Sequence, residues 1–235
     1  MATTKGIAKQ AGNVSPGTNG QEVFASASLL GQLFTANWRQ NFLLAGRLYN
    51  VTVGGLTAGG AETWLTGGGA GTTIDQDQPE LIIGVDSGYY LFPVSLYVSC
   101  LVKLVGGGVG QSAKIIAMGD NSVGIPTSVT GTTETVTNML DGGPSFPGRA
   151  YSGMTADLAD PGVEILLASK NVTCSAVGTN AGPVVFNLDL DKEWDTPPLL
   201  TGPCSIYVSW GGEVAVGGIA SLVVGCVPTT WLPTS

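Results

Sequence analysis

Two stretches of this sequence decide its fold: residues 93–108, PVSLYVSCLVKLVGGG, and residues 203–218, PCSIYVSWGGEVAVGG. Both alternate between apolar and hydroxyl-bearing side chains, a period of two that is typical of a strand buried on one face. The predicted inward faces consist of Leu96, Val98, Cys100, Val102 and Leu104, and of Cys204, Ile206, Val208 and Trp210. The predicted outward faces consist of Ser95, Tyr97, Ser99, Leu101 and Lys103, and of Ser205, Tyr207 and Ser209. Such a small, hydroxyl-rich face suits contact with solvent or close packing against another subunit.

The two stretches also resemble each other, since seven of their sixteen positions are identical without a gap. One interpretation is a duplication of two β units of roughly 110 residues, the size of an immunoglobulin-type domain. The other is that alternating strands of one composition look alike. The similarity does not extend into the flanking segments, which favours the second interpretation and a single domain.

Short strand-like runs continue on both sides and are separated by Gly, Pro, Asn and Asp. They are rich in Val, Ile, Tyr and Thr, which favour strands. The predicted strands are 43–54, 61–67, 80–85, 89–106, 113–119, 133–140, 163–169, 171–177, 182–190, 204–210 and 219–227. This number and spacing predict an all-β fold, an antiparallel β-sandwich or a barrel. Residues 119–162 are rich in turn formers and predict long surface loops.

The first 40 residues predict an N-terminal arm that precedes a β domain at 41–235. Residues 1–22 are small and polar, with Pro-Gly and Asn-Gly turn signals, and predict an extended arm. Apolar residues at roughly helical spacing in 23–34 predict a short helix. We expect no signal peptide, because an apolar segment is lacking, and no membrane span, because no run of about 18 apolar residues occurs.

The composition excludes most enzyme chemistry. The chain contains no histidine, so it lacks His-assisted serine and cysteine nucleophiles, His-bearing zinc sites and most general bases near neutral pH. Only 11% of its residues are charged, against roughly 25% in soluble domains. Such a surface fits either a secreted, Ser-, Thr- and Gly-rich β protein or a subunit covered by copies of itself. We expect no enzymatic activity and no cofactor.

The charge distribution argues against nucleic-acid binding. The formal net charge is −8, and the nine Lys and Arg residues are scattered without a basic run. Proteins that bind nucleic acid neutralise its phosphates with clustered Lys and Arg. We therefore expect no direct contact with a genome through a basic arm.

One tripeptide, Asp86-Ser87-Gly88, follows an apolar run as in the active-site turn of aspartic proteases. Such a site needs two carboxylates that share a proton. No second Asp-Ser/Thr-Gly occurs, so only a dimer would supply both carboxylates. Because Asp, Ser and Gly are also common turn formers, we favour a turn between two strands.

Two acidic segments are candidates for calcium binding. Their residues are Asp75, Asp77 and Glu80 in the first, and Asp189, Asp191, Glu193 and Asp195 in the second. Calcium requires several converging oxygen ligands, and alternating acids on one strand share a face. The spacing is not that of an EF-hand loop, so we favour a solvated acidic edge that discourages strand pairing. No metal site is assigned.

The other motifs carry weaker signals. Four widely spaced cysteines predict buried free thiols rather than a zinc site: Cys100, Cys174, Cys204 and Cys226. Residues 106–114 are similar to a phosphate loop but lack its Gly-Lys-Ser/Thr core. Sequons that matter only in a secretory pathway begin at Asn13, Asn50 and Asn171. Five single tryptophans favour core or interface positions over a carbohydrate platform: Trp38, Trp64, Trp194, Trp210 and Trp231.

The segment TPPLLTGPCSIYVSWGGEVAVGG, residues 196–218, resembles the end of the jelly-roll coat proteins of small icosahedral viruses. There a loop bounded by Pro and Gly leads into a final strand of the type Gly-x-Ile/Leu-Tyr-Val-x-Tyr/Trp. The resemblance implies a single jelly roll with an extended N-terminal arm. It also implies a structural coat protein that self-assembles into a symmetric virus or phage shell, located in the virion and accompanied by other virion proteins.

The N-terminal arm departs from that family. Many RNA-virus coat proteins carry a basic arm, whereas this chain has two lysines in its first 38 residues. The departure fits a shell over an internal membrane, an outer layer, or a coat whose genome is neutralised by something else. Residues 1–22 hold too few apolar side chains to form a core, so we expect the arm to lie on an adjacent copy. The alternative functions are a phage receptor-binding or lectin-like β-sandwich module, and the dimeric aspartic protease.

Overall fold

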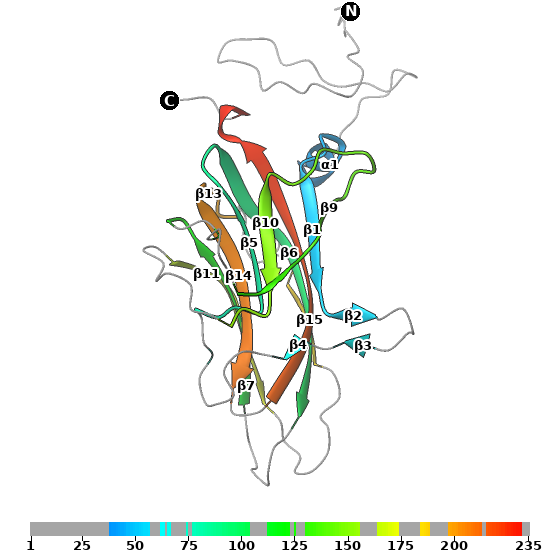
Figure 1. Ribbon diagram of the computed structural model, residues 1–235, viewed down its shortest axis with the longest axis vertical. Coiled ribbons are helices and arrows are strands. Elements are labelled where there is room, and N and C mark those ends of the chain that lie inside the picture. Colours follow the sequence, from blue (N-terminus) through cyan, green and yellow to red (C-terminus); the bar gives the residue numbers. More distant parts are fainter. Residues whose placement is uncertain are drawn as a thin grey trace, which may run out of the picture.

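Two antiparallel β-sheets face each other in the computed structural model (Figure 1). The prediction of an all-β antiparallel sandwich is therefore confirmed. The structure describes residues 38–56, 62–63, 65–66, 74, 77–103, 112–122, 125, 130–155, 164–173, 184–188, 197–212 and 215–231. The arm predicted at 1–22 and the helix predicted at 23–34 lie outside these residues.

The first sheet, called sheet one here, has seven strands. Five lie side by side in the order β12 (Val184–Leu188), β6 (Tyr89–Lys103), β15 (Ala215–Pro228), β1 (Leu48–Val53) and β9 (Val136–Asn138). The two others are short: β13 (Leu200–Thr201) pairs with β6, and β4 (Leu65–Thr66) pairs with β15.

The second sheet, called sheet two, has six strands. Their order is β11 (Glu164–Thr173), β7 (Ser112–Asp120), β14 (Cys204–Gly212), β5 (Leu81–Val85), β10 (Gly148–Ser152) and β8 (Thr132–Thr133). Outside the sandwich, β2 (Gly55–Leu56) pairs with β3 (Glu62–Thr63). The described helices are α1 (Trp38–Leu44) and the 3₁₀ turn η1 (Thr229–Trp231).

Eight of these strands form the frame of the sandwich, and they pair from the two ends of the chain inward. β1 pairs with β15, β5 with β14, β6 with β12, and β7 with β11, each antiparallel. Two more antiparallel pairings, β6 with β15 and β7 with β14, join these pairs into the two sheets. The first similar stretch contributes to β6, and the second forms β14 and the first four residues of β15. Both β6 and β14 are interior strands, one in each sheet.

The core lies between the sheets and contains the predicted inward faces. Their described side chains are all at most 1% exposed: Leu96, Val98, Cys100, Cys204, Ile206, Val208 and Trp210. Trp210 donates its indole N–H to the Leu65 carbonyl at 3.3 Å. Gly218 faces this ring, because a Cβ there would lie 2.5 Å from Cε2 of Trp210. The alternation in the sequence therefore identified the core side of both strands correctly.

The prediction of long surface loops over 119–162 is wrong for much of that segment. It contains β8, β9 and β10, and it extends both sheets, because β9 pairs with β1 and β10 pairs with β5. Ala150 of β10 reaches the core. The strand predicted at 133–140 contains β9. β10 was not predicted, because a strand of five residues between turn formers shows little period.

Two predicted strand boundaries are also wrong. The strand predicted at 43–54 starts only at Leu48, because α1 occupies the residues up to Leu44. The strands predicted at 163–169 and 171–177 are a single strand, β11, over their described part, with a register shift between Leu166 and Ala168. The strand continues through Lys170, where the prediction divided it, because Ser169 to Thr173 all pair with β7.

Candidate assembly surfaces

One end of the sandwich carries a group of four side chains that we call the aromatic cluster: Phe42, Arg47, Phe92 and Trp231. The rings of Phe42 and Phe92 meet edge to face, with centroids 5.2 Å apart. Phe42 also lies 6.3 Å from the Trp231 ring. The guanidinium carbon of Arg47 is 5.3 Å from the centroid of that ring, within the range of a cation–π interaction. The cluster thus connects α1 to η1.

α1 covers one end of the outer face of sheet one. Phe42 and Leu43 pack against an apolar group on that face, which consists of Leu48, Phe92, Val94 and Val223. Arg39 donates from Nη2 to the Val94 carbonyl at 3.5 Å. Seven residues make a helix too short to be stable alone, so this tertiary packing explains why α1 forms where the sequence pattern indicated a strand.

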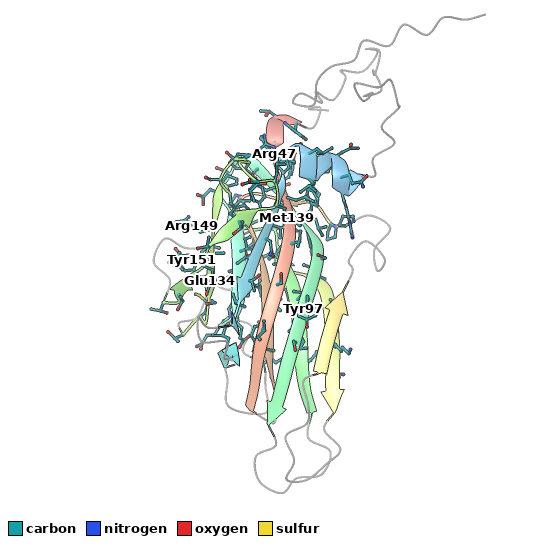
Figure 2. The ribbon with its side chains drawn as sticks, turned by 90° about the vertical axis from the view of Figure 1, so that its right-hand side faces the viewer. Arg47, Tyr97, Glu134, Met139, Arg149 and Tyr151 are labelled. Atoms are coloured by element: carbon teal, nitrogen blue, oxygen red, sulfur yellow. The ribbon has the colours of Figure 1, made fainter. Side chains whose placement is uncertain are left out.

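Beyond α1, the outer face of sheet one is polar, and none of its described side chains on β1, β6 and β15 carries a charge. A closed ring of hydrogen bonds joins Asn50, Thr52 and Ser221: Asn50 donates to Thr52 at 3.5 Å, Thr52 to Ser221 at 3.4 Å, and Ser221 to Asn50 at 2.9 Å. Tyr97 lies opposite Ser221 in the register and is 40% exposed (Figure 2). The predicted outward position of Tyr97 is therefore confirmed.

The outer side of β14 in sheet two is covered by the protein's own chain, and the outward position predicted for Ser205, Tyr207 and Ser209 is wrong. All three side chains are at most 3% exposed. Tyr207 belongs to a second apolar cluster together with Ile82, Ile116, Met118, Ile125 and Met154. β14 is thus buried on both faces, and its hydroxyl-rich face is available neither to solvent nor to another subunit.

Two acidic groups on sheet two, the buried Asp120 and the exposed Glu164, accept hydrogen bonds from nearby donors. The Tyr207 hydroxyl donates to Glu164 on β11. Burial, followed by this hydrogen bond and the negative charges of Glu164 and Asp120, raises the pKa of Tyr207 above its ordinary value. Asp120 accepts from the backbone N–H and the hydroxyl of Ser122, both at 2.8 Å. The contact between Tyr207 and Glu164 links β14 to β11, and Asp120 holds the turn that follows β7.

Strands β8 to β10 form one flank of the sandwich, where Figure 2 labels Glu134, Arg149 and Tyr151. Arg149 donates to Asp86 at 3.2 Å and to the Ile125 carbonyl at 3.4 Å. Ser152 donates to Glu134. These contacts hold the segment against the frame, so this flank is an ordered part of the surface.

The Asp86-Ser87-Gly88 tripeptide is a turn between β5 and β6, as the favoured interpretation predicted. Gly88 has a φ of 97°, a left-handed conformation that glycine adopts readily. Asp86 is exposed and forms an ion pair with Arg149 at 3.2 Å.

The first acidic segment is not a solvated edge throughout. Glu80 is 2% exposed and accepts a hydrogen bond from the backbone N–H of Trp210 at 2.7 Å, so it satisfies a buried donor in sheet two. Asp77 is half-buried. Asp75 and the second segment, 189–195, lie outside the described residues. Within the described part of the chain, no three acidic or cysteine side chains converge as metal ligands would.

Cys100, Cys204 and Cys226 are buried free thiols, as predicted. Burial raises the pKa of each thiol to about 12. Cys174, the glycine-rich residues 106–111 and the sequon at Asn13 lie outside the described residues. Trp210 is in the core, as predicted, and Trp231 is half-buried in the aromatic cluster.

Five large apolar side chains are exposed among the described residues: Leu44, Tyr97, Met139, Leu166 and Leu199. Leu44 ends α1, and Met139 lies nearby because its N–H donates to the Leu48 carbonyl at 2.9 Å. The sequence singled out only Tyr97 of these five. The others sit at ends of elements or next to a bulge, where no alternation indicates which way a side chain points.

No family model, curated protein or solved structure matches this chain. Among the described residues, no helix has the length and apolar character needed to cross a membrane. Function must therefore be argued from the strand pairing and the surfaces described above.

Proposed function

We propose that this chain is a coat protein whose single jelly-roll domain self-assembles into the shell of a virus or phage. The pairing of the eight frame strands carries this proposal. In chain order, the first pairs with the last, the second with the seventh, the third with the sixth and the fourth with the fifth. A long hairpin rolled up on itself has this pairing, and the resulting jelly roll is an architecture of viral capsid and lectin domains.

The surfaces support self-association. Charged side chains keep monomers soluble and apart, and only 11% of the residues in this chain are charged. The open part of sheet one exposes Tyr97 among uncharged polar groups, and Leu44 and Met139 are exposed at the end that holds α1. Copies of the same chain in a symmetric shell are the proposed partners, with other virion proteins as further partners.

The proposal includes no contact with nucleic acid through a basic arm. The nine Lys and Arg residues are scattered, and only two of them precede α1. Phosphate neutralisation requires several cations along one surface. We propose that the protein is located in the virion and that other components neutralise the phosphate charge of the genome.

A receptor-binding or lectin-like module is the second candidate, and Tyr97 favours it. An exposed aromatic ring beside hydroxyl and amide groups combines an apolar body with polar partners, a composition that suits a sugar. The hydroxyl of Ser221 lies opposite Tyr97 in the register, within the ring of hydrogen bonds to Asn50 and Thr52. Jelly rolls also occur among lectins, so the strand pairing does not separate the two candidates.

The test is the size of the purified full-length protein at physiological salt, measured by light scattering and negative-stain microscopy. Closed particles of uniform size are expected. A clean monomer or small oligomer at micromolar concentration would contradict the coat function. Binding of such a monomer to a glycan array, abolished by Tyr97→Ala but not by Leu199→Ala, would then favour the second candidate.

A further inference from the structure

The aromatic cluster brings together the two ends of the described chain. Trp231, in η1, contacts Phe42 from α1 and Arg47 from the segment that follows α1. Backbone hydrogen bonds fix η1 and its strand: Cys226 N–H donates to the Arg47 carbonyl, and Thr229 N–H donates to the Gly88 carbonyl, both at 3.0 Å. Figure 2 shows Arg47 at this end of the sandwich, where α1 and η1 lie side by side.

α1 depends on the last elements of the chain for its position. An isolated helix needs roughly 12–15 residues to be stable in water, and α1 has seven. Its Phe42 ring rests against Trp231 and Phe92. Phe92 in turn lies directly over Gly225 of β15, where a Cβ would be 2.0 Å from Cζ of the ring. β15 and η1 therefore support α1 both directly and through Phe92.

We propose that the aromatic cluster is a latch that makes assembly depend on a folded C-terminus. The chain leaves the sandwich toward residues 1–37 at α1, so the orientation of α1 sets where that segment begins. A chain whose η1 has not yet folded lacks the contacts of Trp231, and its α1 is loose. Such a chain does not direct its N-terminal segment to a neighbouring copy. This inference rests on the proposed coat function.

The chain carries its own reporters of the latch, because it has three arginines: Arg39, Arg47 and Arg149. Arg39 lies in α1, Arg47 lies between α1 and β1, and Arg149 lies in β10, which is paired on both sides. Cleavage of a folded protein follows the population of the locally open form. An arginine-specific protease therefore reports opening of α1 by cuts after Arg39 and Arg47, and global unfolding by a cut after Arg149.

The experiment compares the full-length wild type with Trp231→Ala, Trp231→Phe and the control Thr230→Ala, an exposed neighbour in η1. Loss of the aromatic and cation–π contacts is expected to speed cleavage after Arg39 and Arg47 roughly tenfold in Trp231→Ala, without cleavage after Arg149. Fewer closed particles are expected by light scattering. Trp231→Phe retains a ring and should lie in between, and Thr230→Ala should match the wild type.

Unchanged cleavage after Arg39 and Arg47 in Trp231→Ala would overturn the latch, as would normal particles formed by a variant whose α1 is open. If Trp231→Ala is cut after Arg149 as fast as after Arg39 and Arg47, this variant is globally unfolded, and the test of the latch then uses Trp231→Phe. That variant must show faster cleavage after Arg39 and Arg47 with Arg149 protected, or the latch is wrong. If the wild type forms no particles, the proposed coat function is wrong, and so is the claim that the latch controls assembly. The cleavage pattern still tests whether Trp231 stabilises the position of α1.

Discussion

Tyr97 and Tyr207 occupy equivalent positions in two similar strands, and replacing each by phenylalanine separates the effect of burial from that of sequence pattern. Tyr207 is 3% exposed, and its hydroxyl donates to Glu164. Tyr97 is 40% exposed on the open part of sheet one. Both replacements remove one oxygen atom and leave the ring, so any difference in stability reflects the surroundings of the two hydroxyls.

The expected magnitudes follow from these surroundings. A hydrogen bond to a charged group contributes about 1.5–3 kcal/mol. Glu164 is itself exposed, so water replaces the lost donor, and we expect Tyr207→Phe to cost about 1.5 kcal/mol, at the lower end of that range. In a chain of this size, that cost lowers Tm by about 3–6 °C. Tyr97→Phe should change the free energy of unfolding by less than about 0.5 kcal/mol.

The measurement is urea unfolding of the unassembled protein, followed by tryptophan fluorescence, for the wild type and both variants. Glu164→Gln and the double variant Tyr207→Phe/Glu164→Gln complete a double-mutant cycle, which should give a coupling energy of at least about 0.5 kcal/mol between the two side chains. A Tyr207→Phe variant as stable as the wild type would refute the claim that Tyr207 is buried and hydrogen-bonded on sheet two. A Tyr97→Phe variant that loses as much stability as Tyr207→Phe would refute the claim that Tyr97 is exposed and Tyr207 is not.

Four further predictions address the core, pH, catalysis and the N-terminal segment. Ile206→Ala should lower the free energy of unfolding by about 2–5 kcal/mol, because Ile206 is fully buried; an unchanged melting temperature would contradict its place in the core. The free energy of unfolding should be fully retained below pH 9 and fall as the pH rises toward 12. The cause is that thiols of the unfolded chain lose their protons at an ordinary pKa of 9.0, whereas burial raises the pKa of the three folded thiols to about 12. Unfolding curves that do not change between pH 8 and pH 11 would be inconsistent with buried thiols. Asp86→Asn should change no proteolytic activity, and cleavage at acidic pH that this variant abolishes would revive the protease hypothesis. Deletion of residues 1–20 should leave a folded β domain that assembles poorly or to the wrong size, whereas normal particles would exclude a role for this segment in assembly.

The sequence predicts the fold class and the core side of its main strands because both follow from alternation along one strand. Each core face is set by consecutive odd or even residues, as in Cys204, Ile206 and Val208, and a period of two survives in any antiparallel sandwich. The turn at Asp86-Ser87-Gly88 is equally local, since three turn-forming residues between two apolar runs suffice to predict it. Both signals were confirmed at these positions, whereas the turn formers over 119–162 concealed β10.

What lies over the far side of a strand does not follow from alternation. The stretches around Tyr97 and Tyr207 share the pattern Tyr-Val-Ser, yet one tyrosine is exposed and the other is buried. The difference arises from Ile125 and Met154, which belong to the segment between β7 and β11 and pack on sheet two from a distance in sequence. A contact between remote segments leaves no periodic trace in either of them. The helical form of α1 has a similar cause, because its partners Phe92 and Trp231 come from other parts of the chain.

The segment between β7 and β11 therefore determines which sheet can meet another molecule. It extends both sheets on one flank through β9 and β10, and it also supplies Ile125 and Met154 to the cover of sheet two. Among the described residues, α1 covers one end of sheet one, and Tyr97 is exposed on the rest of that outer face. Sheet two exposes Leu166 on β11, whereas the described interior strands of sheet one are open around Tyr97. β14 of sheet two has a similar pattern, but both of its faces are buried within the subunit.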